Sequence, residues 1–204
     1  HPLHAEPAPV SQYAAGKIAA RRANPGDDLI SKLTRAEVNG RPLTDPEITG
    51  MVSLVLIGGM DTVVTALSFA ALFLARNPSH RRQLVDNPKL IPKAVEELLR
   101  RFPIVNQGRC LAEDWEYKGV PFKAGDMILL PTTLHGLDER VFPNPLEVDF
   151  NRLAPMHSTF GNGAHRCPGS NLARTELKVF LEEWLKRIPE FHLQPGGKIA
   201  MRSG

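Results

Sequence analysis

The chain has 204 residues, 42% of them hydrophobic, which allows a medium domain with its own core and excludes a largely disordered chain. The net charge is +3, and the Lys and Arg residues are not interleaved with aromatic residues, which argues against nucleic-acid binding. The two cysteines, Cys110 and Cys167, lie far apart and outside any CxxC spacing. This argues against a disulfide framework or a zinc site, and favours a reducing, cytoplasmic setting.

The first half of the chain is predicted to be helical. Helices are expected over residues 10–22 and 28–33, and Asn39-Gly40 marks a turn after them. Residues 44–47 (Thr-Asp-Pro-Glu) have the form of a capping box and begin a long helix that is expected to reach Arg76. Asn77-Pro78 ends that helix, and two further helices are expected over residues 79–86 and 93–102.

The long helix needs a test for membrane insertion. Residues 51–74 carry a single charge, Asp61, and are long enough to span a bilayer. An acid, two glycines and several hydroxyl groups near the midpoint are unfavourable in lipid. We therefore expect a buried helix through the middle of a large fold and no membrane association. A transmembrane span is the alternative.

The second half changes in character. A hairpin is expected over residues 115–121, a strand over 126–130, and an ordered meander rich in Pro, Asn and Asp over 141–155. A final amphipathic helix is expected over residues 168–187. Its apolar face would comprise Leu172, Leu177, Phe180, Leu181, Trp184 and Leu185. The predicted fold class is mainly α with a minor β region.

The strongest chemical signal is the segment from Phe160 to Gly169, which has the form F-x-x-G-x-x-x-C-x-G. Its glycines let the backbone approach a flat ligand, and Cys167 stands just before a predicted helix, whose N-terminus stabilises a thiolate. A lone cysteine can also be a buried apolar residue, which is the alternative. The whole pattern resembles the cysteine loop of the cytochromes P450.

This resemblance implies haem b as the cofactor and Cys167 as the thiolate ligand of its iron. In that family the thiolate pushes electron density toward the iron and favours O–O cleavage. Phe160 and Gly163 of the same loop are then expected to contact the haem.

Glu97 and Arg100 form an E-x-x-R motif on a predicted helix, and their spacing places both on one face. An exposed ion pair, worth about 0.2–0.5 kcal/mol, is the simpler interpretation. The family resemblance implies instead a structural Glu–Arg pair that an arginine of the meander completes. Arg152 is the matching residue.

Residues 58–62 (Gly-Gly-Met-Asp-Thr) lie inside the long apolar helix. Paired glycines weaken a helix, allow a kink and let a planar group approach, so a solvated kink is one interpretation. The family resemblance implies that Gly58 and Gly59 lie against the haem. It also implies that Asp61 and Thr62 are catalytic residues that manage proton delivery during oxygen activation.

Residues 96–102 and 134–140 further resemble the bacterial, camphor-hydroxylating branch of the family. This implies that Arg109 and His165 hold the haem propionates, a task that suits a guanidinium. Plain surface residues are the alternative. Gln107, also expected to bind the cofactor, stands where that branch has an Asp, so the shielding of the propionates is expected to differ. The residues expected to line the substrate side of the haem are Leu54, Ile57 and Val105.

Pro168 follows the expected iron ligand. Proline has no N–H to donate to the sulfur of Cys167, and it suits the first position of a helix. The camphor-hydroxylating relative has a non-proline residue there. We hypothesise that the thiolate is a stronger electron donor here and that the reduction potential of the haem is lower.

The resemblance covers nearly the whole chain but only about half of the family's fold. Residues 1–204 are therefore expected to be one partial domain, the haem-binding C-terminal half, with the N-terminal half absent. The expected function is a monooxygenase that inserts one oxygen atom from O₂ into a small apolar, terpenoid-like substrate. Its electrons would come from a separate ferredoxin of the two-iron two-sulfur type, with its reductase. The alternatives are a haem-binding fragment without catalytic activity and a helical interaction module with an incidental cysteine.

Overall fold

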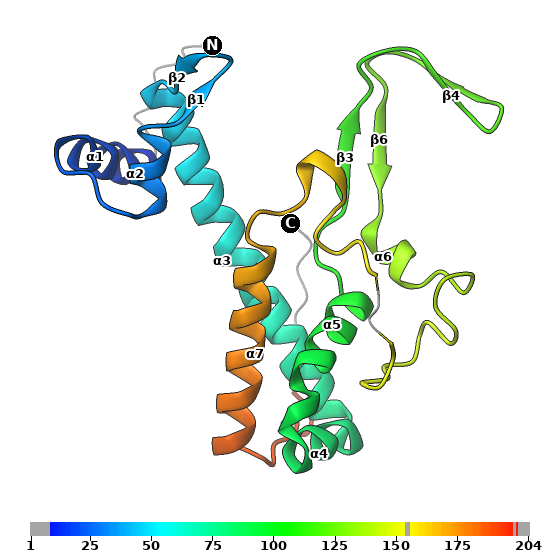
Figure 1. Ribbon diagram of the computed structural model, residues 1–204. Coiled ribbons are helices and arrows are strands. Elements are labelled where there is room, and N and C mark those ends of the chain that lie inside the picture. The colour runs from blue at the N-terminus through cyan, green and yellow to red at the C-terminus, as the bar shows by residue number, and fades with distance from the viewer. Residues whose placement is uncertain (1–8, 154–155, 198, 200–204) are drawn as a thin grey trace. The chain divides into compact units, whose positions relative to one another are not determined.

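The computed structural model describes residues 9–153, 156–197 and 199 (Figure 1). The chain divides into two compact units, His1–Asp61 and Thr62–Gly204. The long helix α3 (Asp45–Arg76) contributes residues to both units. Its predicted start and end are confirmed, and Thr44 N–H donates to Glu47 Oε2 at 2.8 Å, as a capping box requires.

The first unit contains α1 (Pro9–Ala23), α2 (Leu29–Leu33) and a hairpin of β1 (Glu37–Val38) and β2 (Arg41–Pro42). Asp28 caps α2, because its Oδ1 accepts from Ser31 N–H at 2.9 Å. The predicted turn at residues 39–40 is confirmed, with positive φ at both positions. The first unit buries its own small core, which comprises Ala14, Ile18, Leu43, Ile48 and Val52.

The second unit is built on helices that pack together. The end of α3 lies with α4 (Pro78–Asp86), a short 3₁₀ turn η1 (Pro88–Leu90), α5 (Ile91–Arg101) and α7 (Ser170–Arg187) (Figure 1). They enclose the larger core, which includes Ala70, Leu74, Leu84, Ile91, Val95, Leu98, Leu177, Leu181 and Leu185.

Four strands extend from these helices. β3 (Gln107–Cys110) pairs antiparallel with β6 (Met127–Leu130), and β4 (Trp115–Tyr117) forms a hairpin with β5 (Val120–Phe122). The predicted hairpin and the strand over residues 126–130 are confirmed. β3 and the short helix α6 (Thr132–Gly136) were not predicted. The described part of the meander, residues 141–153, contains no helix or strand, and residues 154–155 lie outside the described residues.

The prediction of a buried long helix is wrong for the described chain. α3 is long and apolar enough to cross a membrane, and only 6% of its most apolar 18-residue stretch is buried in the protein. Leu54 is 72% exposed and Ile57 is 57% exposed. The reason is that the ends of α3 contribute to the two cores, whereas no described element covers its middle.

The last helix differs from its prediction in two details. α7 begins at Ser170, so Pro168 lies in the preceding turn and not at the first helical position. Leu172 is 63% exposed, although the predicted apolar face included it. The C-terminal part of the predicted apolar face is confirmed, because Leu177, Leu181 and Leu185 are buried.

Candidate functional site

The cysteine loop closes on itself just before α7. Gly161 and Gly163 have φ values of 71° and 70°, a left-handed conformation that other residues rarely adopt. Cys167 N–H donates to the Phe160 carbonyl at 2.8 Å and joins the two ends of the loop. Cys167 itself is exposed. The loop therefore presents a thiol that a ligand can reach.

The loop packs closely against β3. A Cβ added to Gly161 would meet the side-chain amide of Gln107, which would have to move aside, and the φ of 71° itself favours glycine at this position. Gln107 Oε1 in turn accepts from Arg109 Nη2 at 2.9 Å. The carboxamide of Gln107 thus has its Nε2 near Gly161 of the loop and its Oε1 bonded to the guanidinium of Arg109.

A pocket of about 460 Å³ lies between the loop, β3, β6 and α6, within the size range of small-ligand sites. Its lining includes Arg109, His165 and Gln107, three of the residues predicted to bind the cofactor. Cys167 is not among the lining residues. The pocket is completed by Leu130, Pro131, Thr132, His135, Ser158, Gly161 and Asn162.

Several polar lining residues were missed by the sequence reasoning. Asn162 Nδ2 donates to Ser158 Oγ at 2.8 Å, and their place beside the loop glycines is a signal that could have found both. Thr132 and His135 lie on α6, whose five residues have no amphipathic pattern to reveal them. The Nδ1 atom of His135 is buried and has no hydrogen-bond partner among the described residues.

The E-x-x-R motif forms a buried network. Glu97 is 1% exposed and Arg100 is fully buried, and their two hydrogen bonds are both 2.8 Å long. Arg152 Nε donates to Glu97 Oε1 at 3.1 Å. These distances bring together the three residues predicted to form this network, and burial excludes the exposed-pair interpretation.

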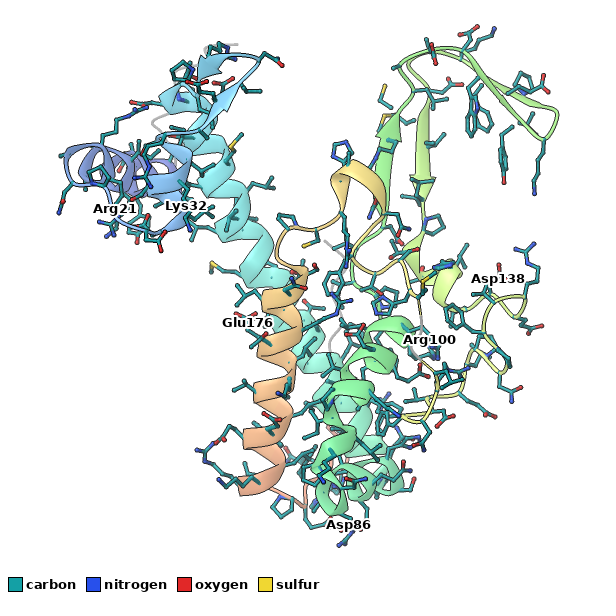
Figure 2. All side chains as sticks on the ribbon, viewed as in Figure 1. Arg21, Lys32, Asp86, Arg100, Asp138 and Glu176 are labelled. Carbon is teal, nitrogen blue, oxygen red and sulfur yellow. The ribbon has the colours of Figure 1, made fainter. Side chains whose placement is uncertain are left out.

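Arg100 also fastens the meander to α5. It lies near the C-terminal end of α5 (Figure 2), and its Nη1 donates to the carbonyl of Pro145 at 2.8 Å. Its Nη2 donates to the carbonyl of Glu147 at 2.9 Å. One guanidinium therefore joins the ion pair to backbone carbonyls of the following segment.

A second ion-pair network was missed by the sequence reasoning. Glu96 accepts hydrogen bonds from Arg174 on α7 and from His157, which precedes the cysteine loop. Burial raises the pKa of Glu96, but these hydrogen bonds outweigh it, and the pKa falls from 4.5 to about 2. Only tertiary packing joins these residues, so no local sequence signal marks them.

Comparison with known proteins places the chain in a family. The family model described as "Cytochrome P450" matches residues 10–89 and 83–203. The chain belongs to the cytochrome P450 family. Haem b is the cofactor of this family, and the chain has the mainly helical fold of its C-terminal, haem-binding half.

The P450 relatives are bacterial and about twice as long. The chain is 39% identical to the probable cytochrome P450 127A1 of Sinorhizobium fredii, covering 87% of this chain and 43% of that protein. It is also 39% identical to a steroid C26-monooxygenase of Mycobacterium tuberculosis, covering 90% of this chain and 46% of that protein. The chain thus spans about half the length of the curated relatives it matches.

Solved P450 structures give the same result. The crystal structure of CYP101C1 matches 95% of this chain and 50% of that chain, with 45% identity and a TM-score of 0.88. The structure of CYP101J2 matches 93% of this chain and 48% of that chain, with 45% identity and a TM-score of 0.87.

The second unit fits the P450 cofactor. Its loop offers an exposed thiol, and Gly161 lies close to the side chain of Gln107 on β3. The guanidinium of Arg109, on β3, and the imidazole of His165, in the loop itself, line a pocket, which suits the carboxylates of a haem. The cysteine, the guanidinium and the pocket all belong to this one unit.

The remaining predicted residues lie mainly on α3. A Cβ added to Gly58 or Gly59 would meet nothing within 4 Å, so the helix surface is open there. Val105, before β3, accepts from Thr132 Oγ1 at 2.7 Å through its carbonyl. Thr62 begins the second unit. The predicted residues that belong to the first unit are Leu54, Ile57, Gly58, Gly59 and Asp61.

Proposed function

We propose that residues 1–204 form the haem-binding half of a bacterial cytochrome P450 monooxygenase and that Cys167 ligates the haem iron. One observation carries this proposal: an exposed cysteine closes a glycine loop, next to a pocket lined by Arg109 and His165. The family supports the reaction class, since its members use a thiolate-bound haem.

The residues of the second unit would hold the cofactor. Cys167 supplies the thiolate, Arg109 and His165 bind the carboxylates, and Gln107 orients Arg109 through the hydrogen bond to its guanidinium. Phe160 and Gly163 shape the loop. The bound haem supplies the oxygen-activating redox chemistry, while the protein provides orientation and protons.

The residues of α3 would serve the reaction. Gly58 and Gly59 leave the helix surface open to a flat group. The carboxyl group of Asp61 and the hydroxyl of Thr62 would manage proton delivery during oxygen activation. These two roles follow from the family motif.

We propose a small apolar, terpenoid-like substrate. Leu54, Ile57 and Val105 are exposed apolar residues that could line its site. A steroid monooxygenase among the relatives fits an apolar substrate class. O₂ is the co-substrate, and a soluble ferredoxin of the two-iron two-sulfur type, with its reductase, would deliver the electrons in the cytoplasm.

Haem reconstitution tests the proposal. The chain is titrated with haem, reduced and exposed to CO, and Cys167→Ser is compared with Cys110→Ser, which removes the other exposed cysteine. We expect the strongly red-shifted Soret band of thiolate ligation in the wild type and in Cys110→Ser, and its loss in Cys167→Ser. An unchanged band in Cys167→Ser would overturn the assignment.

Turnover then separates the enzyme from a haem-binding fragment. The reconstituted chain is supplied with a ferredoxin, its reductase and apolar terpenoids, and products are analysed by mass spectrometry. Incorporation of one oxygen atom from labelled O₂ supports the monooxygenase. A thiolate spectrum without product supports the fragment.

A further inference from the structure

The turn that enters the cysteine loop is held by side chains to which the proposed function gives no role. Glu96 on α5, His157 before the loop and Arg174 on α7 meet at this turn. Arg174 Nε donates to Glu96 Oε1 at 2.6 Å, and Arg174 Nη2 donates to Glu96 Oε2 at 3.1 Å. A bidentate pair of this kind fixes the plane of the guanidinium.

The oriented guanidinium lies over the first residue of the loop. The Cζ atom of Arg174 is 4.6 Å from the centroid of the Phe160 ring, which is a cation–π distance. Phe160 also packs against the large core. The ring therefore contacts both the core and an arginine that Glu96 keeps in place.

His157 ties the same turn to α5. Its side chain is 2% exposed, and its Nε2 lies 3.1 Å from Glu96 Oε2. Thr159 N–H points to the other ring nitrogen, Nδ1, at 3.4 Å. A neutral ring protonated on Nε2 satisfies both contacts, since Nε2–H donates to the carboxylate and Nδ1 accepts. Thr159 Oγ1 adds a bond to the carbonyl of Leu99 at 2.8 Å.

Phe160 is also the residue whose backbone carbonyl forms a hydrogen bond with Cys167. The Phe160 carbonyl accepts from Cys167 N–H at 2.8 Å. Any shift of Phe160 would therefore move the backbone amide next to the sulfur. Hydrogen bonding and backbone position around a ligating sulfur tune its metal.

We propose that Glu96, His157 and Arg174 act as a loop clamp, a set of positioning residues that place Cys167 for iron ligation through Phe160. The inference rests on the proposed function, because it concerns the ligand of the same haem. A purely structural role is the competing explanation. It would lower stability without changing the environment of Cys167.

Four variants separate these explanations. His157→Phe keeps a buried ring but loses the donor to Glu96, whereas His157→Gln restores a donor at the position of Nε2. Arg174→Lys keeps the charge but loses the planar fork. Glu190→Gln is the matched control, because it breaks an ion pair with the buried Arg81, beyond the other end of α7.

The first measurement needs no haem. Amide hydrogen exchange at Cys167 reports directly on the bond to Phe160. We expect exchange about tenfold faster in His157→Phe and Arg174→Lys, and close to wild type in His157→Gln and Glu190→Gln. Nitrogen chemical shifts of His157 should show the Nε2–H tautomer.

The second measurement uses the haem-loaded chain. We expect His157→Phe and Arg174→Lys to lose a large part of the red-shifted ferrous–CO band, and His157→Gln to retain it. If both disruptive variants match Glu190→Gln in Cys167 exchange and in the CO band, the clamp is only structural and the inference is overturned. A wild type that never shows the thiolate band refutes the proposed function, while Cys167 exchange still decides on the clamp.

Discussion

Two glycines of the cysteine loop share a left-handed backbone but differ in their surroundings. Gly161 packs on Gln107, whereas a Cβ at Gly163 would meet nothing within 4 Å. Gly163→Ala should therefore cost only the backbone strain, about 1 kcal/mol of unfolding free energy. Gly161→Ala should cost somewhat more, about 1–2 kcal/mol, because the new Cβ must also move the flexible end of the Gln107 side chain. Urea unfolding measures both, and equal losses would contradict the close packing.

Pro168 carries a prediction about the haem itself. It lies in the turn between Cys167 and α7, where it offers no N–H to the sulfur. Replacing it with leucine adds a potential donor, which would withdraw electron density from the thiolate and raise the reduction potential. Redox titration of haem-loaded wild type and Pro168→Leu measures the difference. An unchanged potential would count against a donor effect.

Glu96 predicts a pH dependence of stability. Its pKa is lowered from 4.5 in the unfolded chain to about 2 in the folded chain, so the folded state favours the carboxylate. The stability that it contributes is fully present above pH 4.5 and is lost as the pH falls through about 2. Glu96→Gln should be less stable than wild type at neutral pH, with a difference that shrinks across this window. A difference that stays constant down to pH 2 would show that the carboxylate is not responsible.

At the scale of elements, α5 and the meander depend on one buried ion pair. Glu97→Gln would leave the charge of Arg100 buried without its counterion, at a cost of about 3–5 kcal/mol. Glu183→Gln breaks an exposed i,i+4 pair with Arg187 on α7 and should cost no more than about 0.5 kcal/mol. Chemical unfolding of both variants tests this contrast. Similar losses of unfolding free energy in the two variants would mean that burial does not determine how much an ion pair stabilises the protein.

The elements that sequence reasoning predicted carry local signals. Thr44 and Glu47 mark the start of α3, and glycine or asparagine marks the hairpin turns, because caps and turns depend on neighbouring residues. β3 has the residues Gln-Gly-Arg-Cys, which show no hydrophobic alternation, so only its pairing with β6 reveals it. α6 is one short turn whose place depends on a close approach to α5: a Cβ on Gly136 would collide with the Arg100 carbonyl.

The residues of the candidate site also differ in how far the sequence predicts them. The cysteine loop and the E-x-x-R motif are compact patterns, and the family likeness supplies their partners. Glu96 and Arg174 are 78 residues apart, and His135 faces the pocket from an element with no pattern of its own. Such residues become neighbours only when α5, α6, α7 and the loop fold together, so a single sequence carries no sign of them.

At the scale of the whole molecule, the middle of α3 exposes apolar side chains that are expected to be buried against another surface. Its length and composition would allow a bilayer to provide it. The half-length match to the P450 relatives favours polypeptide instead, since those relatives contain as much chain again. Asp61 supports this choice, because a carboxylate near the centre of a spanning helix costs about 2.5–3.5 kcal/mol.

We therefore predict that the chain does not insert into lipid. In flotation with phosphatidylcholine vesicles, the wild type should stay in the dense fraction, and it should bind a fluorescent hydrophobic dye through the exposed residues of α3. Asp61→Leu removes the charged barrier and should shift part of the protein to the floating fraction. Wild type that floats and resists sodium carbonate extraction would contradict the prediction, because it would show that α3 takes its cover from the bilayer.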